Sequence, residues 1–173
     1  MRARLPAGRG TWAAIWMLPS DPYRYSTTCE PNEDWQGSRT CDAWPNSGEI
    51  DILEHVGFNM HKIWGTVHNR AYYFINQEQR KASVEGRDVD SAFHVYSVEW
   101  SPDAIQLFFD GSPYFTYTNE GNGWRSWPYD HPYHLILNLA IGGDWGRAGG
   151  PIDDSIFPVR MEIDYVRVFK QEQ

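Results

Sequence analysis

Three carboxylic acids lie within six residues of the segment Ser47–His55: Glu49, Asp51 and Glu54. Apolar residues alternate with the first two, as in a β-strand with one buried face, so Glu49 and Asp51 share a face. Like charges on one strand face repel each other, and a purely structural strand gains nothing from them. The pattern therefore predicts a site that uses paired carboxyl groups. An acidic surface strand or a metal-binding strand is the alternative.

The spacing of the two glutamates sets a geometric condition. Glu49 and Glu54 are an odd number of positions apart, so a regular strand would place them on opposite faces. One β-bulge near Ile52 and Leu53 would bring Glu54 to the face of Glu49 and Asp51. With α-carbons roughly 13 Å apart, glutamates that lean together bring their carboxyl groups to about 5–6 Å, the separation of a retaining glycosidase. One glutamate would then attack the anomeric carbon, and the other, with its pKa raised by its neighbours, would protonate the leaving oxygen.

The elements that must position these acids are strands. Period-2 alternation recurs along the chain and is interrupted by Gly, Pro, Asn and Asp turns, which is typical of a sandwich or barrel. A short turn near Asn119–Trp127 is the one helical signal, and Met1–Pro6 resembles the middle of a strand. The predicted strands are Thr11–Leu18, Gly48–His55, Lys62–Asn69, Phe93–Trp100, Ala104–Asp110, Pro113–Thr118, Tyr133–Ile141 and Arg160–Phe169.

Length and composition narrow the class of protein. The 173 residues suit one domain with a sizeable core. A net charge of −8 without a basic stripe disfavours nucleic acid as a partner, and no apolar run reaches transmembrane length. The 9 Trp, 10 Tyr and 8 Phe are a surplus for a core alone, and indoles stack on the apolar faces of pyranose rings. The composition therefore favours a sugar-binding groove.

Cys29 and Cys41 are the two cysteines, and they lie in a stretch rich in Pro, Asn, Ser and Asp that predicts a long loop. A disulfide between them would stabilise the fold by roughly 3 kcal/mol. The alternative is a pair of free thiols. Because the spacing is not Cys-x-x-Cys, an oxidising compartment fits better than a metal site. We therefore expect a secreted protein, extracellular or periplasmic, although no signal-peptide pattern occurs in the 173 residues.

The segment Glu49–Glu54 resembles the active-site motif of glycoside hydrolase family 16, in the spacing typical of its laminarinase-like members. The similarity covers nearly the whole chain, and its segments are individually weak but strong in this order. They are Arg2–Pro6, Gly10–Pro19, Trp44–Gly48, Gly65–His68, Phe93–Tyr96, Glu99–Trp100, Leu137–Gly143 and Ile163–Val168.

The resemblance implies an all-β fold: a concanavalin A-like jelly-roll sandwich of two antiparallel sheets, one of them concave and forming the glycan cleft. It implies a single catalytic domain over residues 1–173 that acts as a retaining endo-β-1,3-glucanase through a covalent glycosyl-enzyme intermediate. Glu49 would be the nucleophile, Glu54 the acid and base, and Asp51 the assisting acid, with no cofactor for catalysis. The implied partner is β-glucan, and we expect a monomer.

The resemblance also implies a set of sugar-binding residues. Trp44 should stack on a sugar beside the cleavage point, on its non-reducing side. Arg2, His68, Asn138 and Trp145 should line the groove.

Two expectations concern the N-terminal side. The family normally has further strands before the position of Arg2, so we expect an incomplete sandwich in this chain. Family members often hold a structural calcium ion with the aspartate that corresponds to Asp164 and with groups of the N-terminal strands. One aspartate is not a calcium site, because that ion takes six or more oxygens. Asp164 is thus a candidate ligand only.

Linkage specificity stays open at this point. The same residues would serve a mixed-linkage β-glucan hydrolase or a galactan hydrolase, because cleft loops decide the preference. A non-catalytic β-glucan-binding protein is a third alternative, and the intact Glu49, Asp51 and Glu54 argue against it.

Overall fold

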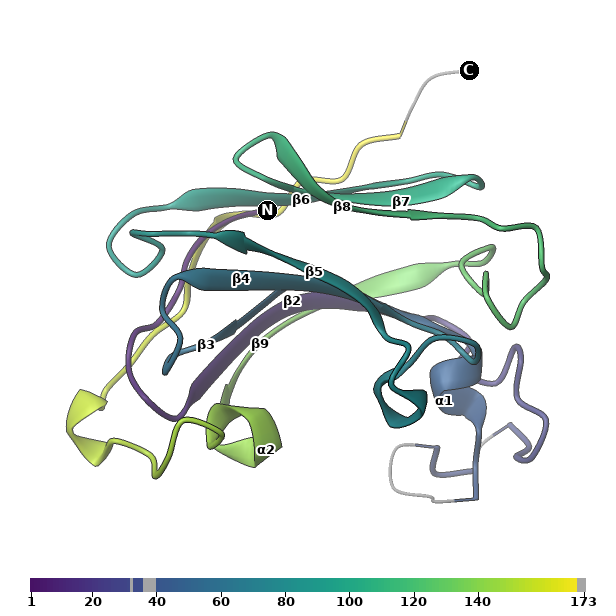
Figure 1. The fold of residues 1–173 in the computed structure, drawn as a ribbon, viewed down its shortest axis with the longest axis horizontal. Coiled ribbons are helices and arrows are strands. Elements are labelled where there is room, and N and C mark those ends of the chain that lie inside the picture. The colour runs from purple at the N-terminus through teal and green to yellow at the C-terminus, as the bar shows by residue number, and fades with distance from the viewer. Residues whose placement is uncertain (32, 36–39, 171–173) are drawn as a thin grey trace.

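The computed structural model describes residues 1–31, 33–35 and 40–170 as two five-stranded antiparallel sheets packed face to face (Figure 1). This confirms the predicted all-β jelly-roll sandwich. The outer sheet has the order β10 (Glu162–Tyr165), β1 (Arg2–Arg4), β6 (His94–Trp100), β7 (Ala104–Phe109), β8 (Ser112–Thr118). The inner sheet has the order β5 (Arg80–Glu85), β4 (Lys62–His68), β3 (Glu49–Val56), β2 (Thr11–Pro19), β9 (Tyr133–Ile141).

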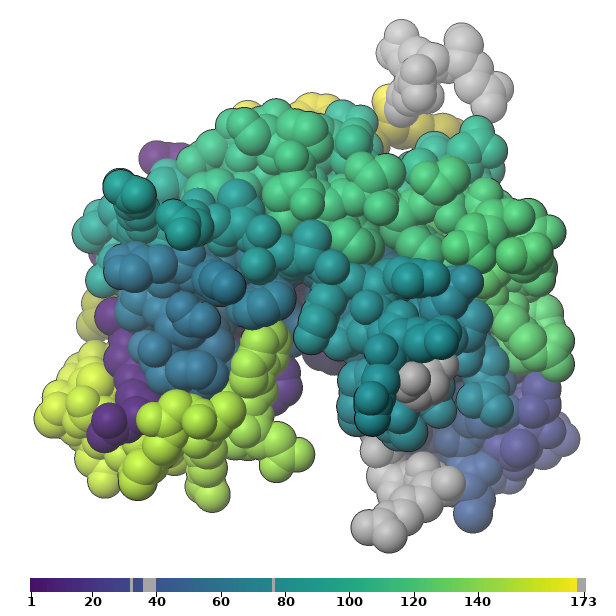
Figure 2. Space-filling view, viewed as in Figure 1, coloured from purple at the N-terminus to yellow at the C-terminus, as the bar shows by residue number. Residues whose placement is uncertain are grey.

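The inner sheet arches away from the outer sheet, and its concave side carries two short helices at opposite ends (Figure 1). These are α1 (Ala43–Asn46) and α2 (Gly143–Gly146); two 3₁₀ turns, η1 (Phe74–Asn76) and η2 (Asp154–Ile156), complete the helical elements of the described residues. Figure 2 shows the molecule hollowed between the α2 end and the α1 end. We call this hollow the groove; its floor is the concave face of the inner sheet.

Strand alternation decides which side chains reach the groove. Ile15, Ile50 and Val67 are fully buried between the sheets, where each contributes about 1.5–3 kcal/mol of burial energy. Residues at the intervening positions lie on the opposite face. Glu49 stands directly across from His68 on β4 in this register. The apolar core thus fixes the polar face of the groove.

The strand predictions are confirmed with small shifts at the ends, except that the last strand is shorter, covering Glu162–Tyr165. Strand β5 was missed because it is an edge strand in which only Ala82 and Val84 pack against the core. The short turn predicted near Asn119–Trp127 is present, closed by a hydrogen bond from the Trp127 amide to the Gly123 carbonyl.

The predicted disulfide between Cys29 and Cys41 is present. Asp42 organises the same loop, since its carboxylate accepts hydrogen bonds from the backbone amides of Thr27 and Thr28 at 2.8 and 3.0 Å. Burial opposes ionisation of Asp42, but these bonds outweigh it and hold the pKa of the carboxyl well below its usual range. Among the described residues, no helix is long and apolar enough to cross a membrane.

Candidate active site

A β-bulge in β3 brings the three acids to one face, as the sequence predicts. On β2, Ile15 pairs with Leu53 and the next residue, Trp16, pairs with Asp51, so Ile52 has no partner on that strand. The extra residue restores the parity of Glu54 with the other two acids. Both residues of the bulge are fully buried. All three acids therefore face the groove.

The outer sheet supports this bulge through the core. The hydroxyl of Tyr114, on β8, donates a hydrogen bond to the Ile52 carbonyl at 3.0 Å, which satisfies a backbone acceptor at the bulge. Gly65 on β4 makes room for it: a β-carbon there would lie 2.5 Å from the Tyr114 hydroxyl and 2.4 Å from Leu107 Cδ1. The lack of a side chain at Gly65 lets the Tyr114 hydroxyl reach the bulge, and its hydrogen bond holds β3 in place there.

Each glutamate accepts one indole N–H. Trp44 Nε1 donates to Glu49 Oε2 at 2.7 Å, and Trp12 Nε1 donates to Glu54 Oε1 at 3.1 Å. Each bond fixes one oxygen of its carboxyl group. Trp12 and Trp44 are themselves packed against neighbouring rings, so both carboxyl groups are held in position.

His68 completes the cluster from β4. Its Nε2 lies 3.1 Å from Asp51 Oδ2 and 3.7 Å from Glu49 Oε1. The side chains of Glu49, Asp51 and His68 are only 15, 3 and 9% exposed. Within the described part of the chain, no Lys or Arg forms an ion pair with any of the three acids.

Burial without a cationic partner raises all three pKa values. Burial, reinforced by the charge of Asp51, raises the pKa of Glu49 to about 8. Burial and the charge of Glu49 raise the pKa of Glu54 to about 7. The pKa of Asp51 also rises well above its usual range, through burial and the charge of Glu54. The three titrate as one coupled group, so the cluster as a whole retains a proton near neutrality.

Aromatic rings flank the acids at both ends. Near Glu54, the rings of Trp12 and Trp64 each make an edge contact with Trp145 of α2, at 5.6 and 6.1 Å between centroids. Near Glu49, Trp44 lies 5.7 Å from the His68 ring. Indole faces of this kind stack on pyranose rings, so the arrangement suits a sugar chain laid across the carboxyl groups.

Comparison with known proteins gives the family. The family model of the glycosyl hydrolases family 16 matches residues 1–167. The chain belongs to this family. A β-glucanase of Rhodothermus marinus is 45% identical over 98% of the chain. The crystal structure of the laminarinase from Rhodothermus marinus superposes with a TM-score of 0.77 at 44% identity over 92% of the chain.

A third relative has sugar bound. SCLam, a non-specific endo-β-1,3(4)-glucanase of family GH16, was co-crystallised as a mutant with 1,3-β-D-cellotriosyl-glucose. Its structure superposes with a TM-score of 0.84 at 38% identity over 98% of the chain. The chain spans a little over half of the length of these relatives: 56% of the β-glucanase, 59% of the laminarinase and 58% of SCLam.

The structure places most predicted groove residues of this family 16 chain around the acids. Trp44, His68 and Trp145 contact the cluster or the rings beside it. Asn138 lies on β9, where its Oδ1 accepts a hydrogen bond from Trp16 Nε1 at 2.8 Å. Their contacts with sugar stay predictions.

Arg2 does not join this group, and the prediction that it lines the groove is wrong. It lies on β1 of the outer sheet, next to the fully buried Ala3, and therefore points away from the core on the side opposite the groove. Its Nη1 lies 2.6 Å from Asp164 Oδ2, and its guanidinium lies 4.8 Å from the Phe93 ring. The guanidinium is paired with Asp164, the carboxylate expected to bind calcium, and the calcium site stays a prediction.

Sequence reasoning missed three supporting residues and left one open. Tyr114 and Gly65 act across the sandwich, and no local pattern marks that contact. Gln79 lies on the segment before β5 and places its amide 3.3 Å from His68 Nε2. The sequence alone does not decide whether Trp12 faces the core or the cleft; the burial of Ala13 and Ile15 in the core places it on the groove face.

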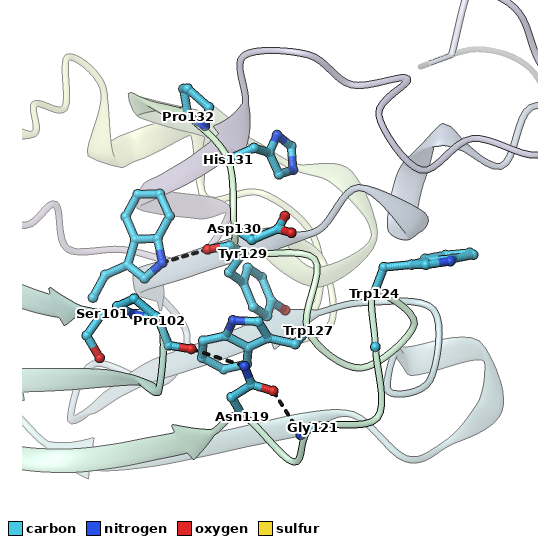
Figure 3. A pocket seen from close by; sticks show the side chains of 12 residues that line it. Ser101, Pro102, Asn119, Gly121, Trp124, Trp127, Tyr129, Asp130, His131 and Pro132 are labelled. Carbon is cyan, nitrogen blue, oxygen red and sulfur yellow. Dashed lines mark hydrogen bonds between the residues drawn. The ribbon is translucent and has the colours of Figure 1, made fainter.

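A second cavity, of about 810 Å³, lies around the loop between β8 and β9 (Figure 3). Several of its polar groups are already paired: Trp100 Nε1 donates to the Tyr129 carbonyl at 2.9 Å, and Asn119 bonds the backbone of Pro102 and Gly121. None of the three acids lines it. The open groove, which holds the three acids, is therefore the candidate active site. The cavity is lined by Trp100, Ser101, Pro102, Asn119, Gly121, Gly123, Trp124, Trp127, Tyr129, Asp130, His131 and Pro132.

Proposed function

We propose that this chain hydrolyses internal β-1,3-glucosidic bonds with retention of configuration. The observation that carries the proposal is the pair Glu49 and Glu54 on one groove face, each held by an indole N–H, with no arginine or lysine of the described residues in an ion pair with them. Similarity to a β-glucanase and a laminarinase supports the choice of β-glucan.

The reaction has two displacement steps. In the first, a carboxylate oxygen of Glu49 forms a bond to the anomeric carbon, the glycosidic C–O bond breaks, and Glu54 gives its proton to the leaving oxygen. In the second, water attacks the anomeric carbon and gives a proton to Glu54, and the ester to Glu49 breaks. Glu54 is restored as an acid and Glu49 as a carboxylate.

The neighbouring groups assign parts of this cycle. Asp51 shares a hydrogen bond with Glu49 and raises its pKa, so its own ionisation is linked to the state of the nucleophile. His68 lies against both acids and orients them. Because the burial of the cluster favours its protonated forms, a proton is available for the leaving group near neutral pH.

The compartment follows from the disulfide. A bond between Cys29 and Cys41 persists outside reducing cytosol, so we propose that the protein acts in an extracellular or periplasmic space, where polymeric glucan is accessible.

A second candidate is a mixed β-1,3/1,4-glucan. The superposition on SCLam, a non-specific endo-β-1,3(4)-glucanase, favours it. The catalytic steps are the same for both polymers, and the groove loops decide which linkage is accepted.

The deciding experiment is reducing-sugar release from a linear β-1,3-glucan and a mixed β-1,3/1,4-glucan, with agarose as a galactan control. Glu49→Gln should abolish release while retaining affinity for glucan in native gels. Glu162→Gln, the same change on the outer sheet, should release sugar normally. Absence of release by a protein that unfolds cooperatively, or full activity of Glu49→Gln, would overturn the proposal; release from agarose alone would redirect it to galactans.

A further inference from the structure

We propose that Glu49, Asp51 and His68 form a binding site for a single zinc ion, which inhibits the enzyme by occupying its nucleophile. Each residue offers one ligand atom, and the three atoms lie within 4.8 Å of one another. The binding claim stands on this geometry alone, and the inhibition rests on the proposed function.

The distances fit a tetrahedral ion. Zn–N bonds of about 2.0–2.1 Å and Zn–O bonds of about 2.0–2.2 Å place neighbouring ligand atoms about 3.3–3.5 Å apart. His68 Nε2 lies 3.1 Å from Asp51 Oδ2 and 3.7 Å from Glu49 Oε1. These two distances bracket that length, and the third, between the carboxylate oxygens of Glu49 and Asp51, is at most 4.8 Å. The fourth position faces the groove and remains for water.

The ligand atoms are available and held in position. Trp44 fixes Oε2 of Glu49, which leaves Oε1 on the side of His68. The Asp51 side chain is 3% exposed, and its Oδ2 has no hydrogen-bond partner in the described structure. A buried carboxylate oxygen without a donor gains most from a cation. Gln79 lies 3.3 Å from His68 Nε2 and has to move aside when the ion binds.

The donor set selects the class of metal. One imidazole nitrogen with two carboxylate oxygens suits a borderline cation such as zinc. Calcium requires six to eight oxygens and magnesium an octahedron of oxygens, which three ligands and an open position do not supply. Three protein ligands with one open position are also the arrangement that leaves zinc exchangeable from solution.

Calorimetric titration of the folded chain with zinc chloride tests the site without reference to activity. We expect one zinc per chain in the wild type. Asp51→Asn and His68→Ala should each weaken binding about 100-fold or more, since even outer-sphere partners contribute 10–100-fold. Glu54→Gln keeps all three ligands and should bind zinc normally. His61→Ala, which removes an exposed histidine, is the matched control.

One rival site is tested by the same method. His94 lies beside Asp110 and Asp88 on the outer sheet, at 2.6 and 3.3 Å. His94→Ala should leave zinc binding unchanged. Loss of binding in His94→Ala, retention in both Asp51→Asn and His68→Ala, or no binding by the wild type would overturn the proposal. If the wild type proves inactive on every glucan, these titrations still decide the site; if it is active, zinc should raise the apparent KM for glucan, reversibly with EDTA.

Discussion

The tripeptide Glu-Ile-Asp occurs on two strands of this protein with opposite outcomes. On β10, Glu162–Asp164 lies on the outer sheet, and each acid pairs with an arginine of β1: Asp164 with Arg2 at 2.6 Å, and Glu162 with Arg4. The two acid side chains are 46 and 35% exposed. On β3, Glu49–Asp51 lies in the groove, with side chains 15 and 3% exposed and with indole and imidazole neighbours.

The difference shows that neighbours, rather than local sequence, decide what an acid does. An ion pair between an exposed carboxylate and a guanidinium is screened by water and contributes little to stability. A buried carboxyl group without a cationic partner has a raised pKa and titrates together with its neighbours, so the cluster on β3 holds protons that its members exchange. The same three residue types therefore form two exposed ion pairs on one sheet and, on the other, the buried cluster that we propose is catalytic.

The strongest test of this contrast exchanges one carboxyl group for an amide on each strand. Glu49→Gln should lower kcat on β-1,3-glucan by at least about 10⁴-fold, because an amide does not form the glycosyl ester. Glu162→Gln should change kcat less than about 2-fold, as expected for a surface substitution. Reducing-sugar assays measure both, and comparable losses in the two variants would refute the contrast.

The acid-and-base role gives a second, smaller effect. Glu54→Gln should lower kcat on glucan by about 10²–10⁴-fold, the range for general acid catalysis. An aryl β-glucoside has a phenolate leaving group that needs no protonation. With this substrate, the effect of Glu54→Gln on the rate of the first displacement should be smaller. Burst kinetics with such a substrate reports that step. Asp164→Asn serves as control, and an equal loss on both substrates would assign Glu54 another role.

The raised pKa values also predict how stability varies with pH. The folded groove binds protons more tightly than the unfolded chain, since the pKa of Glu49 rises from 4.5 to about 8. This contribution is fully present below pH 4.5 and is lost as the pH rises through 8. Urea unfolding should thus show a decline between these limits that is smaller in Glu49→Gln and unchanged in Glu162→Gln. A profile that rises over this window would contradict the burial of the cluster.

Support of the bulge by the outer sheet is testable by removing one oxygen. Tyr114→Phe leaves the Ile52 carbonyl without its donor and should destabilise the fold by about 1–3 kcal/mol. The pH dependence of kcat should shift as well, because the bulge sets the spacing of the acids. Tyr165→Phe on β10 should cost less than about 0.5 kcal/mol. Denaturant unfolding and pH–rate profiles measure both variants. Equally small effects of Tyr114→Phe and Tyr165→Phe would show that the Tyr114 hydroxyl does not support the bulge.

The smallest effect belongs to the outer ion pairs. Arg2→Ala should lower stability by about 1 kcal/mol or less, as for a partly exposed pair, and leave the KM for glucan unchanged. A several-fold rise in KM would restore Arg2 to the groove and contradict its placement on the outer sheet.

Much of this architecture was predictable because it rests on local patterns. Alternation gave the strands, the odd spacing of Glu49 and Glu54 gave the bulge, and the loop composition gave the disulfide. The failures are tertiary. Arg2 was placed in the groove because its sequence neighbourhood matched the family, whereas its side depends on which sheet β1 joins. The contact of Tyr114 with Ile52 joins residues 62 positions apart, which no window of sequence reveals.

Because of the bulge, the number of residues between Glu49 and Glu54 matters to the site as much as their types. Deleting either Ile52 or Leu53 would straighten β3 yet leave the two glutamates four positions apart, on the same face. Deleting both would leave them three apart, on opposite faces. The segment can therefore lose one residue without separating its acids, but not two. A change of one residue in the length of this segment can therefore alter the shape of β3 while keeping both glutamates on one face.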